Sequence, residues 1–291
     1  MTRLSTGYGE SCSSSPRRVG RDGELTLRFA RRADATVLAS SRFTPPLQVI
    51  RSVALGDGSA YLMLLNSGGG LVGGDRLATH IRLESQAHAC LTTASATKVY
   101  RTVGEPATQQ TAIDVEAGAV LEYLPDHVIP YAGSALRQAL RVAMAPTSRA
   151  IIADGFAAGR VGRGERWEFA LFDSAVNVCC EGRPVYFNRT RIVPRISAPA
   201  GPGIAQGFNY VGTLLVLAGR WAGWEALEQA LNERLDASPA VLAGTSLLAR
   251  DGCVVRLLTR TATELAETTR ALWTVARKSL LGLDKLDLRK T

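Results

Sequence analysis

Residues 61–75 read YLMLLNSGGGLVGGD. The five mostly apolar residues 61–65 have the length and composition of a buried strand. Five glycines occupy the seven positions 68–74, a density typical of backbone with φ > 0 or of close approach by other groups. One acid, Asp75, ends the run. We therefore predict a strand that leads into a bare backbone loop with a single carboxylate at its end.

A dinucleotide-binding loop is the obvious rival interpretation, because Gly68, Gly70 and Gly73 fit the G-x-G-x-x-G pattern. That motif needs a helix directly after it, with the pyrophosphate at the helix N-terminus. Residues 76–84 instead alternate between apolar and polar, which predicts a half-exposed strand. No acid lies near position 93, and no Walker lysine follows the glycines. A glycine-rich hairpin or bulge inside a β protein is favoured, and no nucleotide site is predicted.

Most of the chain alternates in short segments separated by turn signals, with no helices between them, which predicts a mainly β architecture. The alternation of Trp167, Phe169 and Leu171 predicts one of these strands, and residues 47–53 and 88–93 are candidates for two others. Two helices are expected late in the chain, over Trp224–Leu235 and from about Glu264 to Leu281. No repeat of fixed period is visible. We expect one domain over residues 23–291, preceded by a disordered basic tail over residues 1–22.

Charge and cysteine content exclude several classes of protein. The net charge is +8, but residues 1–32 and 277–291 hold most of the excess and the middle is nearly neutral. Basic and aromatic residues are not interleaved, so no nucleic-acid partner is expected. The five cysteines make no metal or disulfide pattern, which favours reduced thiols in a cytoplasm. No apolar run is long enough to span a bilayer, and no secretory signal is present, so no membrane partner is expected.

Catalytic residues cannot be assigned from the sequence. Only three histidines occur, and no nucleophile–base pair or complete metal-ligand set is visible. His88 and Cys90 would share one strand face, where ordinary packing is favoured over metal binding. A second glycine-rich segment, residues 158–167, presents Glu165 much as the first presents Asp75. Two acids on bare loops suit a loosely held divalent cation, although paired acids on turns are also common in solvent.

Four segments together resemble the urease accessory protein UreD family, called UreH in some bacteria. The segments are GGGLVGGD at 68–75, TTASATKVYR at 92–101, LEYLPDHVIPY at 121–131 and GRVGRGE at 159–165. They occur in the family's order, and the resemblance covers roughly residues 23–283. It implies a superhelical fold of stacked β-sheets. The C-terminus reads DLRKT at 287–291 in place of the family's longer or aromatic-ended tail, which puts contacts of such a tail in question.

The resemblance also implies a non-enzymatic role in urease maturation. Family members act with UreF and the GTPase UreG on apo-urease and assist nickel delivery, and an internal tunnel has been proposed as the route. No tightly bound cofactor is implied, only transient Ni²⁺. By motif position, Asp75 and Glu165 are the acids expected on that route. Further candidates are Glu122, Asp126 and His127, for which fold-maintaining contacts are an equal alternative, and Lys98, Tyr100 and Arg101, which would meet a partner or brace a turn, with bracing favoured.

A hydrolase is the alternative from a different class. A β scaffold with a carboxylate pair could process glycans, with Trp167, Trp221 and Trp224 stacking on the sugars. Burial of these tryptophans in a core would argue against it.

Overall fold

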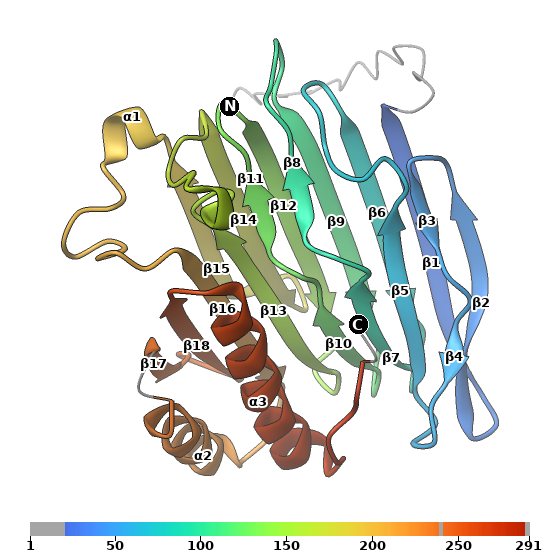
Figure 1. Ribbon diagram of the computed structural model, residues 1–291. Helices are drawn as coiled ribbons and strands as arrows, with labels where there is room; N and C mark the ends of the chain where they lie inside the picture. Colours follow the sequence, from blue (N-terminus) through green and yellow to red (C-terminus); the bar gives the residue numbers. More distant parts are fainter. Residues whose placement is uncertain (1–20, 239–240, 289–291) are drawn as a thin grey trace, which may run out of the picture.

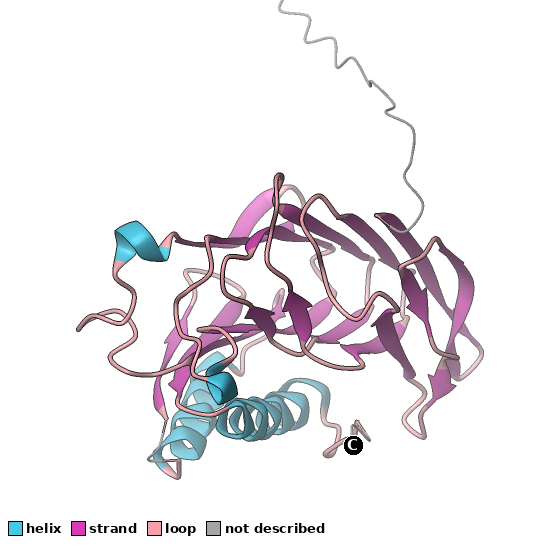
Figure 2. Ribbon diagram, turned by 45° about the horizontal axis from the view of Figure 1, so that its top comes forward, coloured by secondary structure: helices cyan, strands magenta, loops and turns pink. Residues whose placement is uncertain are grey.

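The computed structural model describes residues 21–238 and 241–288, with 48% of the residues in strands and 15% in helices. The predicted tail over residues 1–22 lies outside the described residues except for its last two positions. Two β-sheets face each other, and helices cover one of them (Figures 1 and 2). The predicted stacked-sheet β architecture with two helices in the C-terminal half is confirmed.

Seven strands form the sheet that we call sheet A, and eleven form sheet B. In sheet A the order is β15-β14-β12-β9-β6-β1-β2, and in sheet B the main path is β17-β18-β16-β13-β10-β7-β5-β3. The bounds in sheet A are β1 Asp22–Arg32, β2 Ala35–Phe43, β6 Arg76–Leu83, β9 Ala107–Val115, β12 Ala135–Met144, β14 Leu171–Cys180 and β15 Arg183–Ile192. Those in sheet B are β3 Leu47–Val49, β4 Val53–Ala54, β5 Ala60–Asn66, β7 His88–Thr93, β8 Thr97–Val99, β10 Val120–Leu124, β11 Val128–Pro130, β13 Arg149–Ala157, β16 Tyr210–Ala218, β17 Leu242–Leu247 and β18 Gly252–Thr259.

The middle of the chain winds as a solenoid. From β5 to β14 the main strands alternate between sheet B and sheet A, and each pairs in parallel with the equivalent strand of the next coil. Ala60 pairs with Ala89, His88 with Val120, and Val120 with Arg149. The strands keep register while the connections differ in length. A structural repeat therefore exists that has no fixed period in the sequence.

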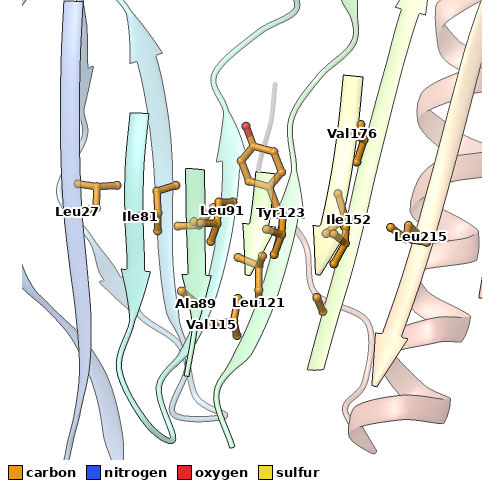
Figure 3. Packing of buried hydrophobic residues seen from close by; sticks show 14 of the residues in the cluster. Leu27, Ile81, Ala89, Leu91, Val115, Leu121, Tyr123, Ile152, Val176 and Leu215 are labelled. Carbon is orange, nitrogen blue, oxygen red and sulfur yellow. The ribbon is translucent and has the colours of Figure 1, made fainter. Parts of the chain in front are cut away.

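Alternating side chains build the core between the two sheets. In β6, Leu77, Ile81 and Leu83 are buried, while His80 and Arg82 are exposed on the outer face of sheet A. Burial of the apolar set of each strand is the main favourable contribution to folding. Figure 3 shows how inward residues of both sheets meet, among them Leu27, Ile81, Leu91, Leu121, Ile152 and Val176.

The helices pack on the outer face of sheet B (Figure 2). α2 spans Trp224–Asp236 and α3 spans Ala262–Leu281, within two residues of the predicted bounds. Thr261 and Glu264 form a capping box at the start of α3, and Gly282 ends it in the left-handed conformation. The other helical segments are α1 (Pro194–Ser197) and the 3-10 turn η1 (Val161–Arg163). Within the described residues, no helix has the length and apolar character that crossing a membrane requires.

Two strand predictions are wrong in detail. The alternating residues 166–170 form a loop, and β14 begins only at Leu171. Trp167 has φ 59°, which no strand allows, and its ring packs against Phe156 and Phe169. The alternation therefore reflects a loop folded onto the core. The predicted strand over residues 47–53 is divided into β3 and β4, which both pair with β5.

Candidate functional site

The four sequence motifs contribute to four successive long connections at one end of the solenoid. Each connection follows a strand of sheet B, and because β5, β7, β10 and β13 are parallel neighbours their C-terminal ends lie side by side. The connections contact one another: Leu71 forms a bridge with Val99, and β8 pairs with β11. Their bounds are residues 67–75, 94–106, 125–134 and 158–170.

Asp75, in the first connection, is 4% exposed. Its Oδ2 accepts a hydrogen bond from the Val72 backbone N–H at 2.9 Å, while Oδ1 is buried with no hydrogen-bond partner. Burial raises the pKa of Asp75, which the Val72 N–H and the charge of Arg21 only partly offset. The carboxylate thus supports the glycine loop and keeps one unmatched oxygen.

Glu165, in the fourth connection, is held by an arginine. Both of its carboxylate oxygens bond to the Arg160 guanidinium, and Oε2 also accepts from the Ala132 backbone N–H at 3.3 Å. The Arg160 hydrogen bonds lower the pKa of Glu165, which stays ionised and paired. The same Arg160 guanidinium stacks over the ring of Tyr131.

The structure does not bring Asp75 and Glu165 together. They have different partners, and they precede β6 and β14, between which β9 and β12 lie in sheet A. Three strand spacings correspond to roughly 14 Å. Within the described part of the chain, no group of three His, Cys, Asp or Glu side chains is placed to hold a metal ion. Any divalent cation would therefore meet these acids one at a time.

Glu122, a candidate from the third motif, sits at the centre of a buried polar network between sheet B and α3. It is 0% exposed, and it bonds to His88 Nε2 at 2.7 Å, to the Trp273 indole N–H at 2.6 Å and to Arg277 at 2.5 Å. Arg277 also pairs with Asp57. These contacts attach α3 to β7 and β10, and they are the fold-maintaining contacts that the sequence left as an alternative for Glu122. We call this set the α3 network.

Sheet B has a gap close to the α3 network. The pairing of β10 with β13 stops at Tyr123 and Ile152, and it resumes only where Val128 of β11 pairs with Phe156. Pro125 has no N–H to donate in between. The Leu124 carbonyl and the Asp126 N–H bond instead to the hydroxyls of Thr92 and Thr93, at 2.6 and 2.8 Å. Side-chain hydroxyls thus replace the missing ladder bonds, and residues 153–155 of β13 face an opening in the sheet.

Three adjoining cavities meet around this gap. The loop-side cavity, about 140 Å³, lies beside the first two connections. The central cavity, about 60 Å³, lies between the sheets. The helix-side cavity, about 90 Å³, lies between sheet B and α3. The central and helix-side cavities share Pro125, Asp126, Ala153 and Asp154, and the central and loop-side cavities share Thr93, Thr97, Gln109, Thr111 and Tyr123.

Polar side chains replace apolar ones at the level of the central cavity. Gln138 and Ser174 lie at inward positions of β12 and β14, where they bond to each other at 2.9 Å. Thr111 of β9 and Tyr123 of β10 face them. Elsewhere the inward positions of these strands carry mainly apolar residues such as Ile113, Leu136 and Val178. The sandwich therefore contains a polar region in an otherwise apolar interior.

Asp154 is a further acid at this gap, and it lies outside the four sequence motifs. It lies in β13 within the apolar run AIIADGFA at 150–157. Because it is two residues from both Ile152 and Phe156, its side chain is on the same side of the strand as theirs, between the two sheets. It lines both the central and the helix-side cavity and forms no ion pair with any described residue. Burial raises its pKa, and the Gly155 N–H offsets this only in part. An acid inside an apolar strand was the signal available in the sequence.

Asp126 and His127 of the third motif lie at the same gap. Asp126 lines both cavities that Asp154 lines, so the two carboxylates flank the opening in sheet B. His127 lines the helix-side cavity, and its ring contacts Tyr210 edge-on at 5.4 Å between centroids. Carboxylate oxygens and an imidazole are ligand types that a borderline divalent cation accepts. The arrangement provides dispersed contacts for such a cation without enclosing it.

Tyr100 and Arg101 make contacts between connections. The Tyr100 hydroxyl donates to the Gly69 carbonyl at 3.3 Å, and its ring packs edge-on against Tyr131. The aliphatic part of Arg101 lies against Gly133. Lys98 lines the loop-side cavity. These contacts are what bracing requires, and the contribution of the three residues to partner binding stays a prediction.

The tryptophans of the predicted glycan hydrolase do not form a common groove. Trp167 packs into the core beside Phe156, while Trp221 and Trp224 contact each other edge-on at the start of α2. No observation favours that alternative, so it is not proposed.

Comparison with known proteins gives a consistent result. The family model described as UreD urease accessory protein matches residues 21–290. A urease accessory protein UreD from Ralstonia nicotianae is 35% identical over 278 residues, covering 92% of each chain. A UreD from Herpetosiphon aurantiacus is 33% identical over 269 residues, covering 89% of this chain and 93% of its own, and a UreD 2 from Streptomyces griseus is 32% identical over the whole of both chains.

Proposed function

The chain belongs to the UreD family of urease accessory proteins, and from that premise we propose that it carries Ni²⁺ to apo-urease through the three adjoining cavities. A role in urease maturation follows from the family itself. The resemblance seen in the sequence is thereby confirmed, whereas the route of the metal and the partners are our proposal.

The proposal depends on one observation. Asp126 and Asp154 flank the gap in sheet B, where the central cavity adjoins the helix-side cavity. Asp154 is partly buried, and withdrawing a carboxylate from water without a cationic partner is costly. A divalent cation at the gap would supply the positive counter-charge for the Asp154 carboxylate. It would also favour the ionised form, against the burial that raises the pKa of Asp154.

Weak binding is what a carrier needs. Structural metal sites enclose the ion with a full set of ligands and hold it tightly. Here the acids are dispersed, and the described residues contain no three-ligand cluster. Ni²⁺ would move between single carboxylates and His127 with part of its hydration shell retained. Nickel is therefore cargo in this proposal, and no tightly bound cofactor is invoked.

The proposal also names the protein partners and a role without catalysis. We propose that the protein works in the cytoplasm as a scaffold, binding apo-urease and UreF, with UreG joining through UreF. Its contribution would be to position and pass the metal, not to catalyse a reaction. Purified protein should then show no urease, GTPase or glycosidase activity of its own.

Asp75 and Glu165 have smaller roles than Asp154 in this proposal. Neither lines any of the three cavities. Asp75 has one unmatched oxygen to offer, whereas Glu165 would first have to leave Arg160. We therefore expect nickel delivery to depend on Asp154 most, on Asp75 less, and on Glu165 least.

The experiment is nickel loading of urease by complexes that carry Asp126→Asn and Asp154→Asn together. Both changes keep the shape of the side chain and remove the charge. The matched control is Asp114→Asn, an acid exposed on the outer face of sheet A. We expect the double variant to assemble with UreF and apo-urease as wild type does and to leave urease depleted of nickel, with the control unchanged. Full nickel content with the double variant would reject the route.

A further inference from the structure

Tyr123 forms the boundary between the central and the loop-side cavity. The alternation of β10 directs Leu121 and Tyr123 between the sheets and Glu122 toward α3. Tyr123 is 7% exposed and is the largest side chain that the two cavities share. Figure 3 shows its ring extending beyond Leu121, with the hydroxyl at the far end. Any ion that moves between these cavities passes between this ring and the four smaller side chains that line both of them.

The backbone at Tyr123 is fixed while the space beside it is open. Tyr123 pairs with Leu91 on one side and with Ile152 on the other, and the second pair is the last one before the gap in sheet B. The hydroxyl has the Thr111 side chain of β9 as its hydrogen-bond partner. Release of that one bond would allow the ring to change its side-chain torsion without disturbing the strand.

Charge differs on the two sides of Tyr123. Asp126 and Asp154 line the central cavity. Among the described residues that line the loop-side cavity there is no acid, and Lys98 is the one with a charge. A divalent cation is therefore stabilised on the central side and repelled on the loop side. The Tyr123 side chain lies between these two environments. Burial and the Asp154 charge raise the pKa of Tyr123 to about 12, so its hydroxyl is neutral at pH 7.

We propose that Tyr123 is a gate for the cation, held closed by its contact with Thr111 and setting the rate at which the ion crosses between the central and loop-side cavities. The inference rests on the proposed function. It adds that the passage contains one rate-determining barrier and that the barrier is a side chain. Tyr123 acts by position and makes no metal bond.

The test measures the rate and the final extent of ⁶³Ni²⁺ incorporation into apo-urease by the assembled complex. Tyr123→Phe and Thr111→Val each remove one side of the hydrogen bond and keep the volume. Both should speed incorporation about fivefold, the factor that one ordinary hydrogen bond represents. Tyr123→Trp, which enlarges the ring, should slow it. The final nickel content should be that of wild type in all three.

Thr268→Val is the matched control, because Thr268 is also a buried threonine but lines none of the three cavities. It should leave the rate unchanged. Wild-type rates for both Tyr123→Phe and Thr111→Val would overturn the gate, as would an equal acceleration by Thr268→Val. Asp154→Asn, measured in parallel, separates the two proposals: if it lowers nickel content while the Tyr123 and Thr111 variants behave as wild type, the route stands and the gate falls.

Discussion

Glu122 and Asp154 lie on neighbouring strands of the same sheet, and their surroundings are opposite. Glu122 faces α3, is fully buried, and bonds to His88, Trp273 and Arg277. Asp154 faces the other side, lines two cavities, and forms no ion pair with a described residue. A buried acid whose oxygens are all matched contributes to the fold. A partly buried acid that lines a cavity and has no ion-pair partner is better explained by a ligand.

The largest loss of stability is expected for a substitution of Glu122. Glu122→Ala removes one of the two carboxylate partners of Arg277 and leaves Asp57, and it also removes the acceptor of the Trp273 N–H. Breaking a buried ion pair on one side typically costs about 3–5 kcal/mol of unfolding free energy. Urea denaturation measures it. The control is Glu116→Ala, which removes an exposed partner of Arg82 and should change little. A loss no larger than the control's would show that the α3 network does not hold the helix.

An intermediate loss of stability is expected for a substitution of His88. His88→Phe removes the contact with Glu122 at 2.7 Å, while Trp273 and Arg277 still bond to the carboxylate. One hydrogen bond to a charged group corresponds to about 1.5–3 kcal/mol. The urea midpoint should therefore lie between those of wild type and Glu122→Ala. A midpoint as low as that of Glu122→Ala would mean that His88, and not Arg277, is the main partner of Glu122.

A substitution of Asp154 is expected to raise the stability of the protein at pH 7. Burial raises the pKa of Asp154 above its ordinary value of 3.8, so the folded state holds its proton to a higher pH than the unfolded state does. The wild type thus loses stability as pH rises through and above that value, and Asp154→Asn does not. The variant should be the more stable protein at pH 7, and the difference should vanish below the ordinary pKa. Urea curves across pH measure this, and a variant less stable at pH 7 would place Asp154 in the same class as Glu122.

The smallest effect is expected at Glu165. Glu165→Gln breaks a part-exposed ion pair with Arg160. Nickel content of matured urease should stay close to wild type, because Arg160 already neutralises the carboxylate. Arg160→Ala is the informative partner variant, since it frees the Glu165 charge without removing it. A large loss of nickel with Glu165→Gln, in a complex that still assembles, would mean that the ion does reach the fourth connection.

Local patterns in the sequence predicted much of this fold. Alternation placed β6 nearly to the residue, because it has one face in the core, and a short apolar segment placed β7, which is buried on both faces. Apolar spacing and cap residues placed α3. The alternation of Trp167 and Phe169 misled, since a loop packed on a core buries every second side chain without pairing as a strand.

The candidate site was predicted less well, because it depends on distance in space. Arg277 is 155 residues from Glu122, and no local pattern indicates that the two meet. The gap in sheet B arises from where pairing stops between β10 and β13, which sequence spacing does not encode. The motifs all lie at one end of the solenoid, and Asp126 and His127 lie at the gap. Asp154 was missed because its neighbours indicate only a buried strand.

The most direct measurement is the position of nickel in the complex. Crystals of the assembled complex, soaked with Ni²⁺ at the concentration that supports urease maturation, can be measured at the nickel absorption edge. We predict an anomalous peak at the gap in sheet B, between Asp126 and Asp154, that disappears in Asp154→Asn. Nickel found only outside the central and helix-side cavities, or the same peak in the variant, would contradict the proposed route.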